Sequence, residues 1–216
     1  MRSLNKNTDS KEIRKTLKRM PITGDYSEIK LLAGNRNKKT DPFKKEAYIY
    51  LLENLTGDLR YVAFLEATKF LNEREFKNCF KKVDEASERL KILKNNKYAY
   101  LYPNEFVTNW NTSNKRTHYT MIYNLPSLQF TKKDTYENRM AWVDESRAYS
   151  LSKIDSKIID VIESTILECP LKAKEAYASV SWANPELLNK IKEDTHPHIK
   201  TALANNYLFN KGAINE

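Results

Sequence analysis

The sequence predicts a mainly α-helical protein with a small β element. From Phe43 to Asn95, apolar residues recur at spacings of three and four, which is the period of one helix face. Between Lys97 and Phe130 the pattern changes to an alternation rich in aromatic and β-branched residues, which is typical of strands. After Asp134 the helical period returns and continues almost to the C-terminus.

Residues 1–40 are expected to form a basic helical arm. In DSKEIRKTLKRM, the apolar residues Ile13, Leu17 and Met20 fall on one face of a helix. Lysines and arginines cover the other face and the loop after it, at Lys11, Arg14, Lys15, Lys18, Arg19, Lys38 and Lys39. Because such cations attract phosphate groups, we expect this arm to contact a nucleic-acid backbone.

Residues 41–131 are expected to form a helical domain with a β-hairpin or wing. Asp41 and Pro42 are typical of a helix start, and Gly57 is expected to close the first helix. Two more helices are predicted, over DLRYVAFLEATKFLN and EREFKNCFKKVDEASERLKILKNN. The second carries a stripe that indicates core packing, made of Phe76, Cys79, Phe80, Val83, Ala86, Leu90 and Leu93. Strands are expected in KYAYLYPNEFVTNW and KRTHYTMIYNLPSLQF.

Residues 132–216 are expected to form a C-terminal helical domain whose last part resembles a helix-turn-helix. NPELLNKIKE predicts one helix, DTH a turn, PHIKTALANN a second helix and YLF a short strand. This order is that of a helix-turn-helix with a wing, in which the second helix enters the major groove of DNA. The apolar residues expected to face inward are Leu187, Leu188, Ile191, Ile199, Ala202 and Leu203. We expect His196, His198, Lys200 and Thr201 to face DNA.

A short repeat supports possible winged-helix units. Leu93-Lys94-Asn95-Asn96 matches Leu203-Ala204-Asn205-Asn206, and each comes after an amphipathic helix and before aromatic residues. Two such units would make a tandem winged-helix protein and would add Lys91 and Lys94 to the residues expected at DNA. In this small part of its length the chain resembles replication initiators of plasmids and phages, although it carries no diagnostic motif of that family.

The composition favours a polyanionic partner. Lys and Arg number 37 against 28 for Asp and Glu, which gives a formal net charge of +9. Scarce glycine with abundant Lys, Asn, Ile and Tyr is typical of AT-rich coding sequences, which include many phages and mobile elements. A basic protein from a lysine-rich proteome would have the same composition without binding nucleic acid.

We expect no association with a membrane. No run approaches the ~20 apolar residues of a membrane span, and the N-terminal charges precede no apolar segment of the kind found in signal peptides. The expected location is the cytoplasm, which is that of the host if the protein is viral.

The sequence supports an enzymatic function less well than it supports DNA binding. His196-Pro197-His198 fits the paired histidines of rolling-circle endonucleases, with Tyr207 as nucleophile, but proline in the middle disfavours the required strand. A zinc site needs further ligands, and the chain's two cysteines lie far apart and are expected to be buried thiols. No glycine-rich phosphate loop is present. We therefore expect no catalysis, no metal and no cofactor.

Two functions from different classes remain. The first is a non-catalytic DNA-binding protein of a phage or mobile element, acting in replication initiation or transcription control. The second is a structural, assembly or host-interaction protein that binds a protein partner through helical surfaces. A basic surface could serve either one, because an acidic protein partner attracts lysines as DNA does. The sequence leaves the DNA target and the oligomeric state open.

Overall fold

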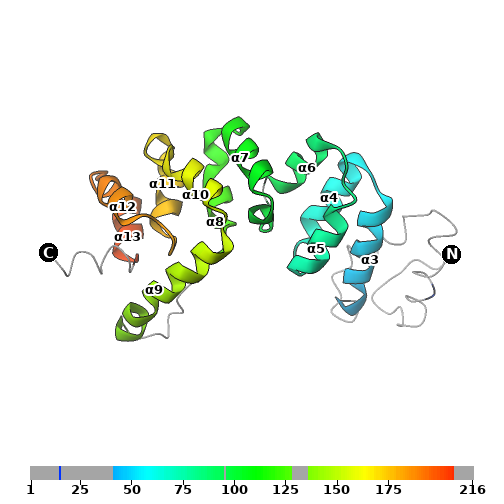
Figure 1. Ribbon diagram of the computed structural model, residues 1–216, viewed down its shortest axis with the longest axis horizontal. Helices are drawn as coiled ribbons and strands as arrows, with labels where there is room; N and C mark the ends of the chain where they lie inside the picture. Colours follow the sequence, from blue (N-terminus) through cyan, green and yellow to red (C-terminus); the bar gives the residue numbers. More distant parts are fainter. Residues whose placement is uncertain (1–14, 16–40, 95, 128–135, 207–216) are drawn as a thin grey trace. The chain divides into compact units, whose positions relative to one another are not determined.

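The computed structural model describes residue 15 and residues 41–94, 96–127 and 136–206. These residues are mainly helical, as predicted, and no strand occurs among them (Figure 1). The chain forms two compact units, Met1–Ile92 and Leu93–Glu216. The expected boundary at 131/132 falls inside the second unit, because helices from both sides of it pack together there.

The first unit contains four helices in its described part: α3 (Asp41–Asn54), α4 (Gly57–Ala67), α5 (Glu73–Phe80) and α6 (Ala86–Leu93). Phe64, Phe76 and Phe80 form its aromatic core, with ring centroids 5.5 to 6.0 Å apart. Asn72 and Glu75 form a reciprocal capping box that fixes the start of α5. Gly57 adopts φ +57°, a left-handed conformation that glycine tolerates, and it begins α4 after the two residues that follow α3.

The single helix expected over residues 73–96 is divided into α5 and α6. The amides of Lys82 and Val83 bond to carbonyls three residues back, which closes α5. Asp84 and Glu85 then precede α6, where carboxylates favour a helix start. Most of the predicted core stripe is buried, whereas Ala86 is exposed at the start of α6.

A buried ion pair fastens α6 to α4, and the sequence pattern does not indicate it. Nε and Nη2 of Arg60 donate to the two carboxylate oxygens of Glu88 at 2.7 and 2.6 Å, and Nη1 donates to the Lys82 carbonyl at 3.1 Å. Both side chains are buried. This two-pronged geometry satisfies the charges on both sides of the pair.

The second unit begins with helices where strands were expected. The prediction of strands over residues 97–127 is wrong, because these residues form η2 (Ala99–Leu101), α7 (Pro103–Thr112), η3 (Lys115–Thr117) and α8 (His118–Tyr123). Phe106 and Trp110 lie one helical turn apart and are both buried, so their spacing satisfies a helix as well as a strand. Pro103 stands at the first helical position, which favours a helix start.

The rest of the second unit is helical in its described residues. It contains α9 (Tyr136–Lys153), α10 (Ser156–Glu163), η4 (Ile166–Glu168), α11 (Leu171–Ala178), α12 (Pro185–Lys192) and α13 (Pro197–Ala204). Helix α11 packs against α8 and α13, and α7 packs against α10. The YLF strand expected at 207–209 lies outside the described residues.

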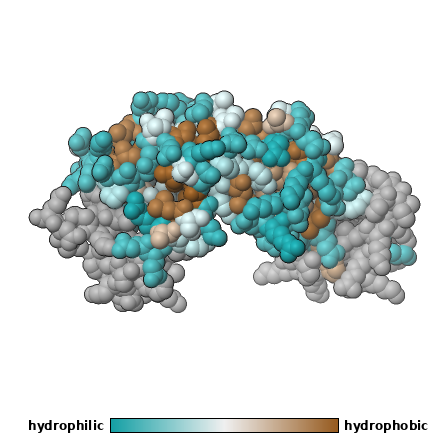
Figure 2. Space-filling model, in the orientation of Figure 1, coloured by the Kyte–Doolittle hydropathy of each residue, from teal (hydrophilic) through white to brown (hydrophobic). Residues whose placement is uncertain are grey.

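On the face seen in Figure 2, hydrophilic residues cover much of the described surface and hydrophobic residues lie among them in separate areas. Large exposed hydrophobic side chains occur at Leu59, Val62, Tyr123, Tyr149, Leu151 and Leu167. Every helix in the described part of the chain is too short or too polar to cross a membrane.

Candidate nucleic-acid interface

Helices α12 and α13 form the helix pair that the sequence predicts, and local capping defines it. The side chain of Asn184 accepts the amide hydrogen of Glu186 at 2.9 Å, directly before Pro185. His196 plays the same part for α13, because its Nδ1 accepts from the amide of His198 at 3.3 Å, directly before Pro197. Two cap-and-proline starts therefore set where each helix begins.

Apolar side chains hold the pair together. Leu188 and Ile191 of α12 are buried, as are Ile199 and Leu203 of α13, and α13 packs against both α11 and α12. Leu187 is only half-buried. The predicted inward face of each helix is thus confirmed, with Leu187 at its edge.

Asn206 fastens the end of α13 to the end of α11. Its Nδ2 donates to the carbonyl of Ala178 at 2.6 Å and to that of Val180 at 3.3 Å. The Asn206 side chain is buried, so it supplies a hydrogen-bond donor to two carbonyl oxygens that water does not reach. The three helices therefore form one packed unit closed at this asparagine.

The outer face of α13 carries the residues that are predicted to face DNA. His198, Lys200 and Thr201 are exposed, and His196 is half-buried at the cap. The Thr201 hydroxyl donates to the Pro197 carbonyl at 3.0 Å, which leaves its oxygen able to accept a hydrogen bond. Nδ1 of His198 lies 3.8 Å from a carboxylate oxygen of Glu175 on α11. This face therefore offers one cation, one hydroxyl and an imidazole beside an acid.

The other predicted DNA contacts that the structure describes are divided between the units: Lys15 and Lys91 lie in the first, and Lys94 lies in the second, which also contains α13. Lys91 belongs to the first unit, where its Nζ donates to Asp58 and lies 4.8 Å from the centroid of the Tyr61 ring. The hydrogen bond with Asp58 raises the pKa of Lys91. Lys94 is half-buried. Lys15 has a helical conformation and is exposed. The remaining predicted cations lie outside the described residues: Lys11, Arg14, Lys18, Arg19, Lys38 and Lys39.

Both cysteines are buried free thiols, as expected, and Cys169 contacts a buried histidine. Nδ1 of His118 lies 3.4 Å from Sγ of Cys169, and Nε2 lies 3.0 Å from the Trp110 carbonyl. Since a carbonyl oxygen only accepts, Nε2 carries the hydrogen and Nδ1 accepts from the thiol. Burial lowers the pKa of His118 and raises the pKa of Cys169. A buried neutral thiol is a poor nucleophile, so this pair packs the core.

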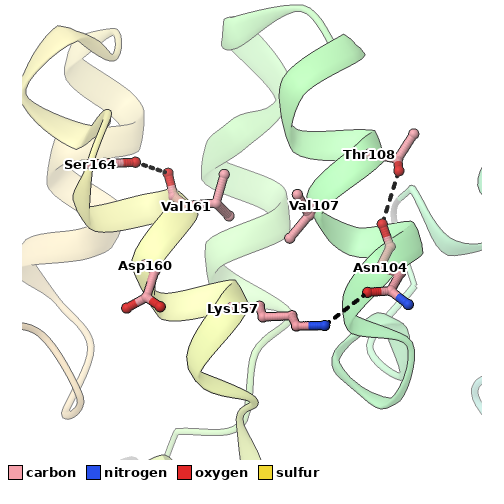
Figure 3. Close-up of a pocket in the computed structure, with 7 residues that line it drawn as sticks. All are labelled: Asn104, Val107, Thr108, Lys157, Asp160, Val161 and Ser164. Atoms are coloured by element: carbon pink, nitrogen blue, oxygen red, sulfur yellow. Dashed lines mark hydrogen bonds between the residues drawn. The ribbon is translucent and has the colours of Figure 1, made fainter.

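A shallow groove of about 660 Å³ lies between α7 and α10 (Figure 3). Its polar groups are largely occupied by one another. The Thr108 and Ser164 hydroxyls donate to carbonyls of their own helices, and Lys157 Nζ lies 3.4 Å from Oδ1 of Asn104. No base is hydrogen-bonded to either hydroxyl in this set, so the groove presents no activated nucleophile.

Metal ligands do not cluster in the described part of the chain, where no group of three or more His, Cys, Asp or Glu side chains could hold an ion. No protein-family model matches the chain, and neither does any curated protein or solved structure with which it was compared. Its function therefore has to be inferred from the chemistry of its own residues.

Proposed function

We propose that this chain is a non-catalytic DNA-binding protein of a phage or mobile element, acting in replication initiation or transcription control. One observation carries the proposal. Helices α12 and α13 are capped at both starts, close on a buried apolar seam and leave His198, Lys200 and Thr201 on the outside. In helix-turn-helix proteins, a second helix that follows a short turn enters the major groove of duplex DNA, and this supports the proposal.

In this proposal α13 contacts the edges of the bases, and basic residues elsewhere in the chain contact the phosphate backbone of the DNA. Lys200 can donate to a guanine edge or a phosphate, and the Thr201 oxygen and methyl group suit a base edge. The basic residues of the N-terminal arm, together with Lys91 and Lys94, add phosphate contacts. The formal net charge of +9 supports long-range attraction to DNA.

A mobility-shift titration of duplex DNA against salt tests the proposal. If about five to eight phosphates are neutralised, the slope of log K against log salt should be roughly −4 to −7. A flat salt response, or no binding near about 50 mM salt, contradicts the nucleic-acid reading.

Variants of α13 test the reading helix itself. The double variant Lys200→Ala/Thr201→Ala should lose about 1–3 kcal/mol of binding free energy and discriminate less among sequences. Lys157→Ala is the matched control, because it removes one exposed lysine from α10 and should weaken all sequences slightly and alike. Melting followed by circular dichroism should be nearly unchanged in both. If the double variant binds every DNA as the parent does, α13 is not the reading helix.

A protein partner is the second candidate, and α4 supplies the observation that favours it. Leu59 and Val62 lie three residues apart and are 53% and 55% exposed. Contiguous exposed apolar patches are typical of surfaces that bind other proteins, and these two side chains would contribute to such a patch. The pair Leu59→Ser/Val62→Ser should leave DNA binding intact. Loss of a partner captured by the parent chain, together with a flat salt response toward DNA, would favour an assembly or host-interaction role.

A further inference from the structure

Two tyrosines and three cations lie together on the second unit, on η3, α8 and α11. We call this set the aromatic–basic patch; its members are Lys115, Arg116, Tyr119, Tyr123 and Lys172. It shares no residue with the outer face of α13. Helix α11 packs against both α8 and α13, so one unit carries both surfaces.

The tyrosines form an aromatic pair on α8. Tyr119 and Tyr123 lie one turn apart, with ring centroids 6.5 Å apart and planes at 81°. Tyr119 is half-buried, whereas Tyr123 is 52% exposed. A tyrosine this exposed offers a flat apolar face to a ligand and keeps its hydroxyl in water.

One cation contacts this pair, and two more lie directly before α8 in the sequence. Nζ of Lys172 lies 5.7 Å from the centroid of the Tyr119 ring. Lys115 and Arg116 are exposed directly before α8, in a turn held by Asn114, whose Oδ1 accepts from the Arg116 amide at 2.9 Å. The buried ring of His118, stacked on Trp110 with centroids 3.9 Å apart, anchors the start of α8 beneath them.

The charge around the patch is one-sided. No Asp or Glu occurs between Glu105 and Asp134, whereas acidic residues are frequent elsewhere in the chain. Glu168 lies 3.6 Å from Nζ of Lys115 and is itself well exposed. The patch therefore presents more cations than acids beside the exposed ring of Tyr123, which is complementary to a polyanion that carries flat rings.

We propose that the aromatic–basic patch binds single-stranded nucleic acid. Unpaired bases stack on Tyr123 and Tyr119, and the phosphates lie against Lys115, Arg116 and Lys172. Stacking on aromatic side chains tolerates any base, because every base has a π-face. A closed duplex hides those faces, so the patch favours unpaired strands over duplex.

The two surfaces would hold different forms of nucleic acid. The α13 face would hold paired DNA, and the aromatic–basic patch would hold unpaired bases. This extends the proposed DNA binding but stands on different residues. Each surface can therefore be tested without the other.

The experiment measures binding of the full chain to oligothymidylate, oligouridylate and a hairpin duplex by mobility shift and calorimetry. Tyr123→Leu should weaken binding to the unpaired oligonucleotides about 5- to 150-fold, because one stacked base is lost. Tyr123→Phe keeps the ring and should bind as the parent does. Replacing Lys115 and Arg116 by Gln should reduce the magnitude of the salt slope by roughly 0.7 for each cation.

Tyr149→Leu is the matched control. Tyr149 on α9 is 46% exposed and has the Nζ of Lys153 5.9 Å from its ring centroid, but it lies outside the patch. This variant should bind as the parent does. Equal losses at Tyr149 and Tyr123, equal binding by Tyr123→Leu and Tyr123→Phe, or no binding of either oligonucleotide by the parent would each overturn the proposal.

The same titrations separate this site from the α13 face. Lys200→Ala/Thr201→Ala should retain binding to the unpaired oligonucleotides, and Tyr123→Leu should retain binding to the hairpin duplex. Preference for oligothymidylate or oligouridylate then identifies DNA or RNA as the strand that the patch prefers.

Discussion

The segments Leu93–Asn96 and Leu203–Asn206 share a sequence pattern and end a helix in the same way. In each, the leucine and the final asparagine are buried. The amide of Asn96 donates to the Leu93 carbonyl at 3.2 Å, and that of Asn206 donates to the Leu203 carbonyl at 3.0 Å. The repeated residues therefore encode a common helix end.

The two asparagine side chains then act differently. Oδ1 of Asn96 accepts from the amide of Tyr98 at 2.9 Å, a local bond that leads the chain into η2 and α7. Asn206 instead donates to Ala178 and Val180 at the end of α11. The match thus marks where a helix ends. The wing expected after the first copy is absent, because helix occupies those residues.

Truncation of the buried leucines should have the largest effect. Leu93→Ala and Leu203→Ala should each lower the free energy of unfolding by about 2–5 kcal/mol, because each leaves a cavity in a packed seam. Urea denaturation followed by circular dichroism measures this. Leu187→Ala is the control; since Leu187 is half-buried, its loss should cost roughly 1 kcal/mol. A similar small cost for Leu203→Ala would mean that α13 is loosely held.

The asparagines should separate the two segments. Asn206→Ala leaves two buried carbonyls without this donor, so the free energy of unfolding should fall by about 1–3 kcal/mol. Asn96→Ala removes an acceptor from one local amide and should cost about 0.5–1.5 kcal/mol.

Aspartate should widen this difference. Asn206→Asp places a carboxylate against two carbonyl oxygens, whereas Asn96→Asp keeps an acceptor for the Tyr98 amide. The Asn206→Asp variant should therefore be the less stable of the two in the same urea titrations. Equal losses at both positions would contradict the distinct roles assigned to the two side chains.

The smallest expected effect is a pH dependence at His118, which starts α8 in the second unit. Burial lowers the pKa of His118, so the unfolded chain takes up this proton before the folded chain does. The stability that neutral His118 provides is fully present above about pH 6.5 and is lost as the pH falls below that value. His118→Phe keeps a ring on Trp110 and should lose less stability between about pH 7 and pH 5 than the parent does. Identical pH profiles in urea titrations would show that protonation of His118 does not limit stability.

Local signals made α12 and α13 predictable. Asn184-Pro185 and the turn before Pro197 indicate the helix starts in neighbouring residues, and the three-four spacing of Leu188, Ile191, Ile199 and Leu203 gives the inward face. Lys200 and Thr201 are exposed because they lie on the side of α13 opposite this inward face. The function of this surface stays a prediction.

Long-range contacts explain what the sequence pattern missed. The Arg60–Glu88 pair spans 28 residues, and the His118–Cys169 contact spans 51. No local spacing encodes such partners. Residues 97–127 carry aromatic residues that fit either period, so their spacing did not distinguish the helices that form there from strands. The sequence shows lysines and tyrosines near residue 115, but the position of Lys172 over Tyr119 depends on the packing of α11 against α8.

Because of the division at Ile92, tryptophan fluorescence can be used to follow one unit separately from the other. All three tryptophans, Trp110, Trp142 and Trp182, come after that boundary, and the first unit contains none. Indole emission therefore reports on the second unit alone, whereas far-ultraviolet dichroism reports on the helices of both. A denaturation in which the two signals change at different urea concentrations would reveal two units that unfold independently, and the order of the transitions would identify which one opens first.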